Sequence, residues 1–237
     1  MTQRAGERRT SGLARTWEWA KSVAVALVIW YVLTAVFVQA FRIPSGSMEG
    51  TLLIGDFLFA NKALYGAEIP LINRRLPAIR EPARQDIVIF DSVEEKGVHV
   101  VKRVIGMPGD TLAMVDNLVF VNGHVLDEPY RVLEGGTRDP SDPKMRWQAG
   151  YLTDGVDRRH YRPTLRNWGP LTVPPDSFFV MGDNRDRSYD SRYWGFLGRD
   201  RIRGHPILVY YSYDKESTLP FRLITGIRWS RLLSRPR

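Results

Sequence analysis

The longest uncharged stretch of the chain is the feature that most restricts its fold. It runs from Ser22 to Phe41 (SVAVALVIWYVLTAVFVQAF), and Arg15 and Lys21 precede it. Twenty helical residues at about 1.5 Å each reach about 30 Å, the thickness of the hydrocarbon core of a bilayer. We therefore predict a transmembrane helix over residues 22–41. The basic residues 1–21 would lie in the cytoplasm, and everything after Phe41 on the other side of the membrane.

A cleavable signal peptide is the alternative interpretation of the same stretch. Val38-Gln39-Ala40 offers the small-x-Ala pattern that such peptides carry at their cleavage site. The uncharged run is longer, however, than the roughly 7–15 apolar residues of a typical signal peptide, which favours a retained anchor. The later apolar run Pro206–Tyr213 has only the length of a strand, so we predict a single pass.

The net charge of +8 lies at the two ends of the chain. Residues 1–21 hold five basic and two acidic side chains, residues 222–237 hold five arginines and no acid, and the remainder is neutral. A basic groove on the folded body therefore lacks support, and we expect no nucleic acid partner. Basic residues beside apolar segments favour a membrane surface instead. The absence of cysteine excludes disulfides, a thiol nucleophile and a cysteine-based metal site.

Beyond Arg42 the sequence changes to short apolar runs separated by Gly, Pro and Asp. The runs are rich in Val, Ile, Phe and Tyr, as strands are. They cover residues 56–61, 86–90, 99–105, 118–121, 177–181 and 207–211. Asn122-Gly123 adds a strong hairpin signal. We therefore predict a mainly β soluble part.

The same patterns suggest a division of the chain. Residues 42–126 and 177–215 carry the strand signals and are predicted to form one β domain. Residues 127–176 are poorer in such signals and rich in Pro, Gly, Arg and Asp, which predicts an inserted, loop-rich subdomain.

The basic tail, residues 216–237, leaves two interpretations open. Ile224, Ile227, Leu232 and Leu233 are spread among its arginines, as in a short amphipathic helix on a lipid surface. A frayed, solvated end explains the same composition equally well.

Two serines and a glycine follow the apolar stretch, in Pro44-Ser45-Gly46-Ser47-Met48. A serine beside a glycine is common in turns, so the segment alone is a weak sign of catalysis. Its position is informative, because a translocated chain would emerge from the membrane there. Position 45 is serine, so the segment lacks the G-x-S-x-G pattern of the nucleophile elbow, which argues against a Ser-His-Asp hydrolase.

A lysine is the best candidate for a base that would activate such a serine. The histidines are scattered and show no metal-binding spacing: His99, His124, His160 and His205. Lys102 is placed by strand alternation on the same apolar face as Val100 and Val104. Burial there would lower its pKa from about 10.4 towards about 7–8, which keeps the amine neutral enough to act as a base. The competing interpretation is a strand-edge lysine whose amine reaches water.

Residues 182–192 (GDNRDRSYDSR) are a dense polar segment directly after a predicted strand. A solvated loop with an Asp-Arg network is one interpretation. A hydrogen-bonded scaffold around an active site is the other, because loops on rigid sheets often carry function.

Together these segments resemble the type I signal peptidases, serine peptidases that use a Ser-Lys dyad. The resemblance extends from about Phe41 to Tyr211 and keeps the family's order of motifs. The matching segments are PSGSMEGTL (44–52), GDFLFANK (55–62), DIVIF (86–90), VKRVIGMPGD (101–110) and GDNRDRSYDSRYWG (182–195).

The resemblance implies a role for individual residues. Ser47 corresponds to the nucleophile and Lys102 to the general base. Ser45 corresponds to the hydroxyl that completes the oxyanion hole with the Ser47 N–H, and Ser188 to the serine that orients the lysine amine. The remaining matches line the substrate pockets (Ile43, Pro44, Met48 and Val101) or brace the site (Arg103, Asp183, Asp190 and Arg192). One departure is Gly50, which stands where most members have proline and puts the stiffness of that turn in doubt.

The resemblance also implies the fold and the activity. The expected fold has two antiparallel β-sheet domains, one inserted in the catalytic domain. The expected protein is a membrane-bound serine endopeptidase that removes N-terminal signal peptides from exported preproteins, after small residues at −1 and −3. It would sit in the bacterial plasma membrane with its catalytic domain on the extracytoplasmic face, and would need no metal or organic cofactor. Its expected partners are preproteins and the lipid bilayer, with the secretion translocon as a further candidate.

Two other classes of protein compete with this interpretation. A self-cleaving repressor also uses a Ser-Lys pair, but it carries a DNA-binding helical domain where this chain has its apolar stretch. A single-pass protein whose β domain only binds partners is the non-enzymatic alternative, and it would give Ser47 no reason to react with an active-site serine label.

Overall fold

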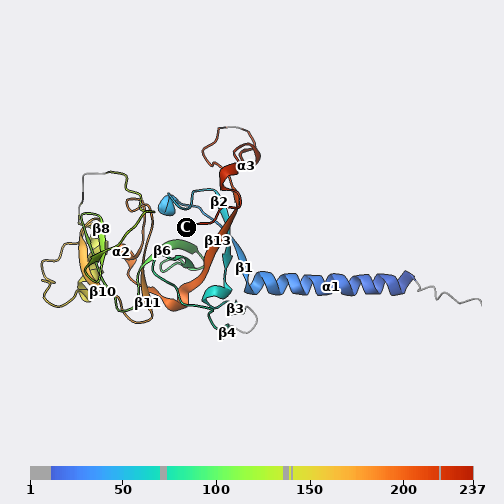
Figure 1. Cartoon of the computed structure of the whole chain (residues 1–237), viewed down its shortest axis with the longest axis horizontal. Coiled ribbons are helices and arrows are strands. Elements are labelled where there is room, and N and C mark those ends of the chain that lie inside the picture. Colours follow the sequence, from blue (N-terminus) through green and yellow to red (C-terminus); the bar gives the residue numbers. More distant parts are fainter. Residues whose placement is uncertain (1–11, 70–73, 136–138, 140, 219, 237) are drawn as a thin grey trace, which may run out of the picture.

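The fold comes from a computed structural model, which describes residues 12–69, 74–135, 139, 141–218 and 220–236. A large sheet, a smaller sheet and a two-stranded hairpin form the framework of the body (Figure 1). Neighbouring strands in these sheets pair in antiparallel fashion. The predicted mainly β fold class is confirmed.

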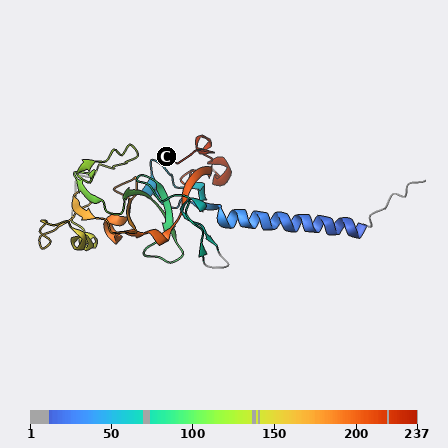
Figure 2. The same cartoon turned by 60° about the horizontal axis from the view of Figure 1, so that its bottom comes forward.

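The N-terminal helix α1 (Gly12–Val36) projects away from this body (Figures 1 and 2). Strand β1 (Val38–Arg42) follows it and pairs with β2 (Asp56–Asn61). The predicted transmembrane helix over residues 22–41 is therefore wrong at its end, because the backbone of residues 38–41 forms part of the sheet. Across the described ranges, no helix combines the length and the apolar character needed to cross a membrane.

The large sheet has the strand order β1-β2-β13-β5-β6-β11-β12. Its remaining strands are β5 (Ile87–Asp91), β6 (His99–Gly106), β11 (Ser177–Met181), β12 (Leu197–Gly198) and β13 (Ile202–Ser212). The long strand β13 runs between β2 and β5 and so joins the two halves of the sheet.

The central strand β5 shows why these segments become strands. Ile87 and Ile89 pack with Met48 and Leu58 in one apolar cluster, whereas Val88 and Phe90 belong to another cluster. Successive side chains of a strand point to opposite faces. A strand that is buried on both faces therefore needs an unbroken apolar run, which is what the sequence has at this point.

The smaller sheet has the order β10-β7-β8-β9. Its strands are β7 (Thr111–Val115), β8 (Leu118–Val121), β9 (His124–Val125) and β10 (Trp168–Thr172). β10 comes from the segment predicted as an insertion and the other strands from the segment before it, so this sheet draws on both sides of the predicted boundary.

The other elements are short. They are the 3₁₀ helices η1 (Gly46–Met48), η2 (Ala63–Tyr65), η3 (Pro143–Tyr151), η4 (Arg199–Arg201) and η5 (Trp229–Arg231), the helices α2 (Ser191–Trp194) and α3 (Arg222–Thr225), and the hairpin strands β3 (Glu68–Ile69) and β4 (Arg74–Arg75).

The C-terminal segment folds back onto β13. The Leu233 N–H donates to the Val209 carbonyl and the Val209 N–H donates to the Ser234 carbonyl, each at 2.8 Å. The interpretation of these residues as a frayed end is therefore wrong, whereas binding of the tail to a lipid surface stays a prediction.

Candidate active site

Ser47 lies in the short helix η1, directly after the edge strand β1. The turn is compact, because the Thr51 and Leu52 N–H groups both donate to the Met48 carbonyl, at 3.0 and 2.8 Å. Met48 and Leu52 are buried in the apolar cluster below it. The turn therefore holds Ser47 at the end of a packed loop, where only 7% of the residue is exposed.

Lys102 reaches Ser47 from strand β6 of the same sheet. Its Nζ lies 2.7 Å from the Ser47 Oγ, and only 3% of the residue is exposed. The prediction that alternation turns this side chain into an apolar face is confirmed, since Val104 on the same face is fully buried. The competing interpretation, an amine that reaches water, does not hold.

Burial lowers the pKa of Lys102 from 10.5 to about 8. The Asp190 and Asp183 carboxylates raise it in part, and the Arg192 guanidinium lowers it. A substantial fraction of the amine is thus neutral near physiological pH, as a base beside a serine requires.

Two further hydroxyls lie near this pair. The Ser45 Oγ is 3.5 Å from the Ser47 Oγ. The buried Ser188 Oγ has no hydrogen-bond partner of good geometry among the described residues, although its proximity helps to lower the pKa of Asp190. No hydrogen bond joins Ser188 to Lys102 in this structure.

Gly182 brings Ser188 and the turn that carries Ser47 together. A Cβ atom at this position would lie 2.3 Å from both the Ser188 Oγ and the Ser47 carbonyl oxygen. Only a residue without a side chain allows this close approach. The glycine that opens the polar motif is therefore a packing requirement of the site.

Buried ion pairs brace the site on either side of Lys102. Arg103 contacts Asp183 through two hydrogen bonds, Nε to Oδ1 at 2.8 Å and Nη2 to Oδ2 at 2.7 Å. Arg192 contacts Asp190 in the same way, at 2.8 and 2.9 Å. Burial disfavours the Asp190 charge, but the Arg192 charge and hydrogen bonds outweigh it and lower the pKa of Asp190. The four bracing residues named from the sequence thus form two pairs.

A small apolar cavity of about 200 Å³ opens beside Ser47. It is lined by β1, the turn that carries Ser47 and the start of β6, namely Phe41, Arg42, Ile43, Pro44, Ser45, Ser47, Met48, Val98, His99, Val100 and Val101. All four residues expected to line the substrate pockets are among them. A cavity of this size suits small apolar side chains.

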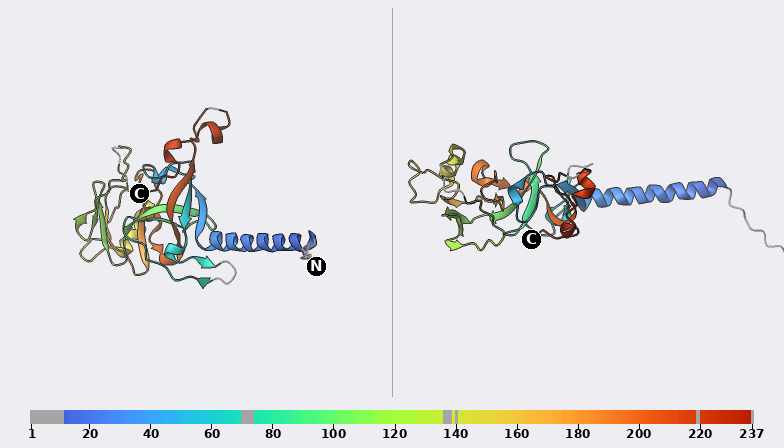
Figure 3. Two further views of the ribbon diagram at one scale, coloured as in Figure 1. Left: turned by 45° about the vertical axis from the view of Figure 1, so that its right-hand side comes forward. Right: turned by 90° about the horizontal axis from the view of Figure 1, so that it is seen from above.

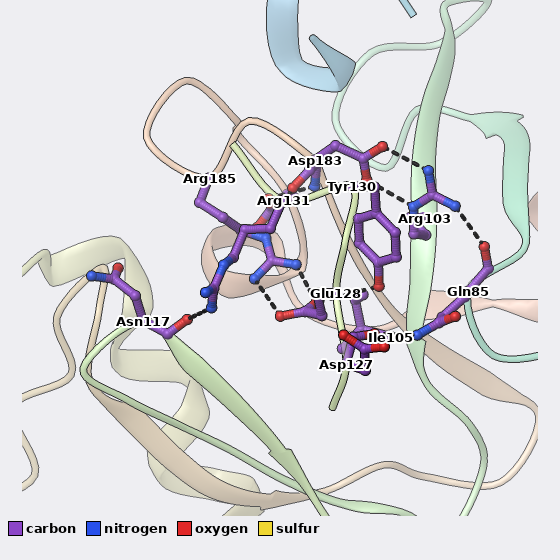
Figure 4. A network of polar contacts seen from close by, with 12 residues as sticks. Gln85, Arg103, Ile105, Asn117, Asp127, Glu128, Tyr130, Arg131, Asp183 and Arg185 are labelled. Carbon is purple, nitrogen blue, oxygen red and sulfur yellow. Dashed lines mark hydrogen bonds and ion pairs between the residues drawn. The ribbon is translucent and has the colours of Figure 1, made fainter. Parts of the chain in front are cut away.

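Sequence reasoning missed the contacts of residues 128–134, a segment that we call the strap; Figure 4 shows its Glu128 and Tyr130 beside Arg185 and Arg103. Tyr130 lies over the Arg103 guanidinium at 3.8 Å. The Val132 N–H donates to the Asp183 carbonyl at 2.8 Å, and Glu128 forms a buried ion pair with Arg185. The strap therefore touches both the lysine strand and the 182–192 loop. Local patterns carried no signal for it, because its partners are distant in sequence.

The strap also explains the departure at Gly50. This residue has a φ of +103°, and a Cβ there would lie 2.8 Å from the Val132 Cγ2. Proline requires a φ near −65°, so the family's proline does not fit this backbone. The turn is stiffened by the strap that packs on it.

In the described part of the chain, no group of three or more His, Asp or Glu side chains is arranged to hold a metal ion.

Comparison with known proteins relates the chain to a described family. Residues 16–211 match the family model "Signal peptidase, peptidase S26". A signal peptidase I of Pseudomonas aeruginosa is 37% identical over 218 residues, covering 86% of this chain and 76% of the relative. One of Bacillus licheniformis is 31% identical over 210 residues, covering 88% and 96%. A crystal structure of a signal peptidase I from Enterococcus faecalis V583 is 30% identical, with a TM-score of 0.36, and covers 54% of this chain and 98% of that one.

The fold and the site thus define a β-sheet hydrolase with a serine beside a buried lysine. The chain belongs to the signal peptidase family, peptidase S26, and is therefore a serine peptidase.

Proposed function

We propose that this protein removes signal peptides from exported preproteins, with Ser47 as the nucleophile and Lys102 as the general base. The observation that carries the assignment of the dyad is the 2.7 Å contact between the Ser47 Oγ and the buried Lys102 amine. The family assignment supports the reaction, because the relatives are signal peptidases.

The acylation step follows from this contact. The neutral Lys102 amine takes the proton of the Ser47 hydroxyl as the Oγ attacks the scissile carbonyl carbon. The oxyanion that forms is held by the Ser47 N–H and the nearby Ser45 hydroxyl. When the C–N bond breaks, the Lys102 ammonium returns its proton to the leaving amine.

Deacylation reuses the same base. A water molecule gives a proton to the Lys102 amine and attacks the acyl-enzyme, and Ser47 leaves with a proton from the ammonium. The proposed task of Ser188 is to orient this amine. A hydroxyl buried beside Gly182 and without a partner in the described residues is available for that bond.

The cavity beside Ser47 supports a preference for small residues at −1 and −3 of the signal peptide. Its lining is mostly apolar and includes Ile43 and Val101. Larger side chains would have to displace this packed wall, so they should be cleaved more slowly.

Location at the bacterial plasma membrane is part of the same proposal. Apolar side chains of α1 are largely exposed, among them Leu27 at 59% and Trp30 at 63%. A helix that presents such residues gains free energy from contact with lipid. The proposed arrangement places the N-terminus in the cytoplasm, the catalytic body on the extracytoplasmic face, and the emerging preprotein and translocon beside it.

The test is incubation of the purified protein with a preprotein and mapping of the cut. We expect a single cut after a small residue, and its loss in Ser47→Ala and Lys102→Ala. The exposed residues Ser141 and Lys96 provide matched controls as Ser141→Ala and Lys96→Ala. Full activity of Lys102→Ala would overturn the dyad, and an intact preprotein after incubation with the wild type would overturn the proposed function.

A further inference from the structure

The C-terminal segment reaches the turn that carries Ser47. The red segment returns to the body near the blue turn after β1 (Figures 1 and 3). It is fixed there by backbone hydrogen bonds to β13, such as that from the Arg228 N–H to the Ser212 carbonyl at 2.9 Å. The segment is thus built into the same sheet that supports the nucleophile.

Arg231 makes the decisive contacts of this segment. Its Nε lies 3.0 Å from the Asp56 Oδ1, its Nη2 lies 2.5 Å from the Asp56 Oδ2, and its Nη2 also donates to the Thr51 carbonyl at 2.9 Å. One planar guanidinium therefore joins both ends of the loop between residues 51 and 56. Arginine is suited to this, because its donors form a rigid fork.

Asp56 is the fully buried partner in this arrangement. Its carboxylate also accepts hydrogen bonds from the Ser212 Oγ at 2.7 Å and from the Leu53 N–H at 2.9 Å. A buried carboxylate is stable only when it is paired and fully hydrogen-bonded. Arg231 supplies its ion pair, so the geometry of this loop depends on a residue 175 positions away.

Thr51 connects the loop to the catalytic groups. Its N–H closes the turn of Ser47 on the Met48 carbonyl at 3.0 Å. Its Oγ1 donates to the Asp183 Oδ2 at 2.6 Å, and Asp183 is the partner of Arg103 next to the catalytic lysine. A shift of Thr51 would therefore move both the nucleophile turn and the ion pair beside Lys102.

We propose that Arg231 is a positioning residue, which holds the Ser47 turn in register with Lys102 through Thr51 and Asp56. The expected changes in kcat rest on the proposed function. At Arg231 the basic tail would thus stabilise the fold itself, which differs from binding lipid or lying free in solvent. Nearby Arg228 assists, since its Nη1 donates to the Ile54 carbonyl at 2.8 Å.

The test compares Arg231→Ala with Arg235→Ala in the full-length protein. Arg235 is an exposed arginine of the same segment and serves as the matched control. For Arg231→Ala we expect kcat on a signal-peptide substrate to fall about 10- to 100-fold, because small displacements of reacting groups are costly, while KM changes less than about twofold. Added guanidinium should restore part of kcat. Arg235→Ala should behave as the wild type.

A second readout does not depend on activity. Hydrogen–deuterium exchange should accelerate in the peptide that contains residues 47–56 in Arg231→Ala, and not in Arg235→Ala. Arg231→Lys keeps the charge beside Asp56 but loses the fork, so it should fold and still show a reduced kcat. If Arg231→Ala does not fold, Arg231→Lys tests the positioning role in its place.

Wild-type kcat in folded Arg231→Ala or Arg231→Lys, or exchange unchanged over residues 47–56, would overturn the positioning role. An inactive wild-type enzyme would overturn the proposed function instead, and the exchange experiment would still report on whether Arg231 holds the turn.

Discussion

The rate of peptide cleavage should depend on pH in a way that Lys102 sets. Its pKa is lowered by burial to about 8, from 10.5 for a free lysine. This difference corresponds to about 3 kcal/mol in favour of the neutral amine. The neutral amine is the active form, so activity is low below the lowered pKa, rises as the pH passes through about 8, and levels off above it.

The expected size of the effect follows from the titration. With a pKa of about 8, the neutral fraction is about 1% at pH 6 and about 90% at pH 9. The value of kcat/KM for a signal-peptide substrate should therefore increase about 90-fold over this interval, with a slope of one on a logarithmic plot below pH 7. An unburied lysine would place the midpoint above pH 10.

The assay is a fluorogenic peptide with a small residue at −1, cleaved in detergent at constant ionic strength. Circular dichroism at each pH verifies that the protein stays folded. Ser47→Ala measured in parallel sets the background. A kcat/KM that is flat between pH 6 and pH 9, or a midpoint near 10.5, would refute the role of the buried lysine as base.

Other variants test the packing around the dyad. Tyr130→Leu should lower kcat several-fold, because the cation–π contact with Arg103 is lost and such contacts contribute about 0.5–2 kcal/mol. Tyr130→Phe keeps the ring over Arg103 and should retain the wild-type kcat. Equal rates for the two variants would contradict a role for the ring. Gly182→Ala should abolish most activity and destabilise the protein by about 1–3 kcal/mol, since its Cβ would collide with the Ser188 hydroxyl; near-normal cleavage and thermal unfolding would speak against the packing argument. Gly50→Pro should also destabilise by about 1–3 kcal/mol in urea unfolding, because a φ of +103° is closed to proline; an unchanged midpoint would show that the turn adapts.

Strands with an apolar pattern could be predicted well from the sequence. The runs predicted at residues 56–61 and 118–121 coincide with β2 and β8, and the run at 177–181 coincides with β11. In β8 and β11 Val or Phe recur at positions that the sheet buries, so local composition contains the information. The residues of the candidate site were found because they fall in motifs with a fixed order.

The failures have a common physical cause, which is pairing with distant parts of the chain. Residues 38–41 look like the end of a membrane helix by composition, but β2 offers them hydrogen bonds that no hydropathy pattern reveals. Likewise, the strap and Arg231 act through partners far along the chain, such as Asp56. Composition alone therefore predicts a solvated basic tail, because it does not reveal that Arg231 pairs with the buried Asp56 carboxylate.

Burial is the largest influence on the pKa of Lys102, and the ion pairs around the dyad limit how far the nearby carboxylates oppose it. An unpaired carboxylate in this buried site would raise the pKa of Lys102 and keep the amine protonated, so that it could not act as a base. Asp190 has that tendency, and Asp183 has it to a smaller degree, since each raises the pKa of Lys102. Each is matched by an arginine, Arg192 and Arg103, at a distance below 3 Å. At the amine the Arg192 charge opposes that of Asp190, and both carboxylates direct their hydrogen bonds to arginines, so the site gains a polar frame in which burial still lowers the pKa of Lys102. A lysine can replace a histidine as base only under this condition, because a serine beside a charged ammonium has nothing to take its proton.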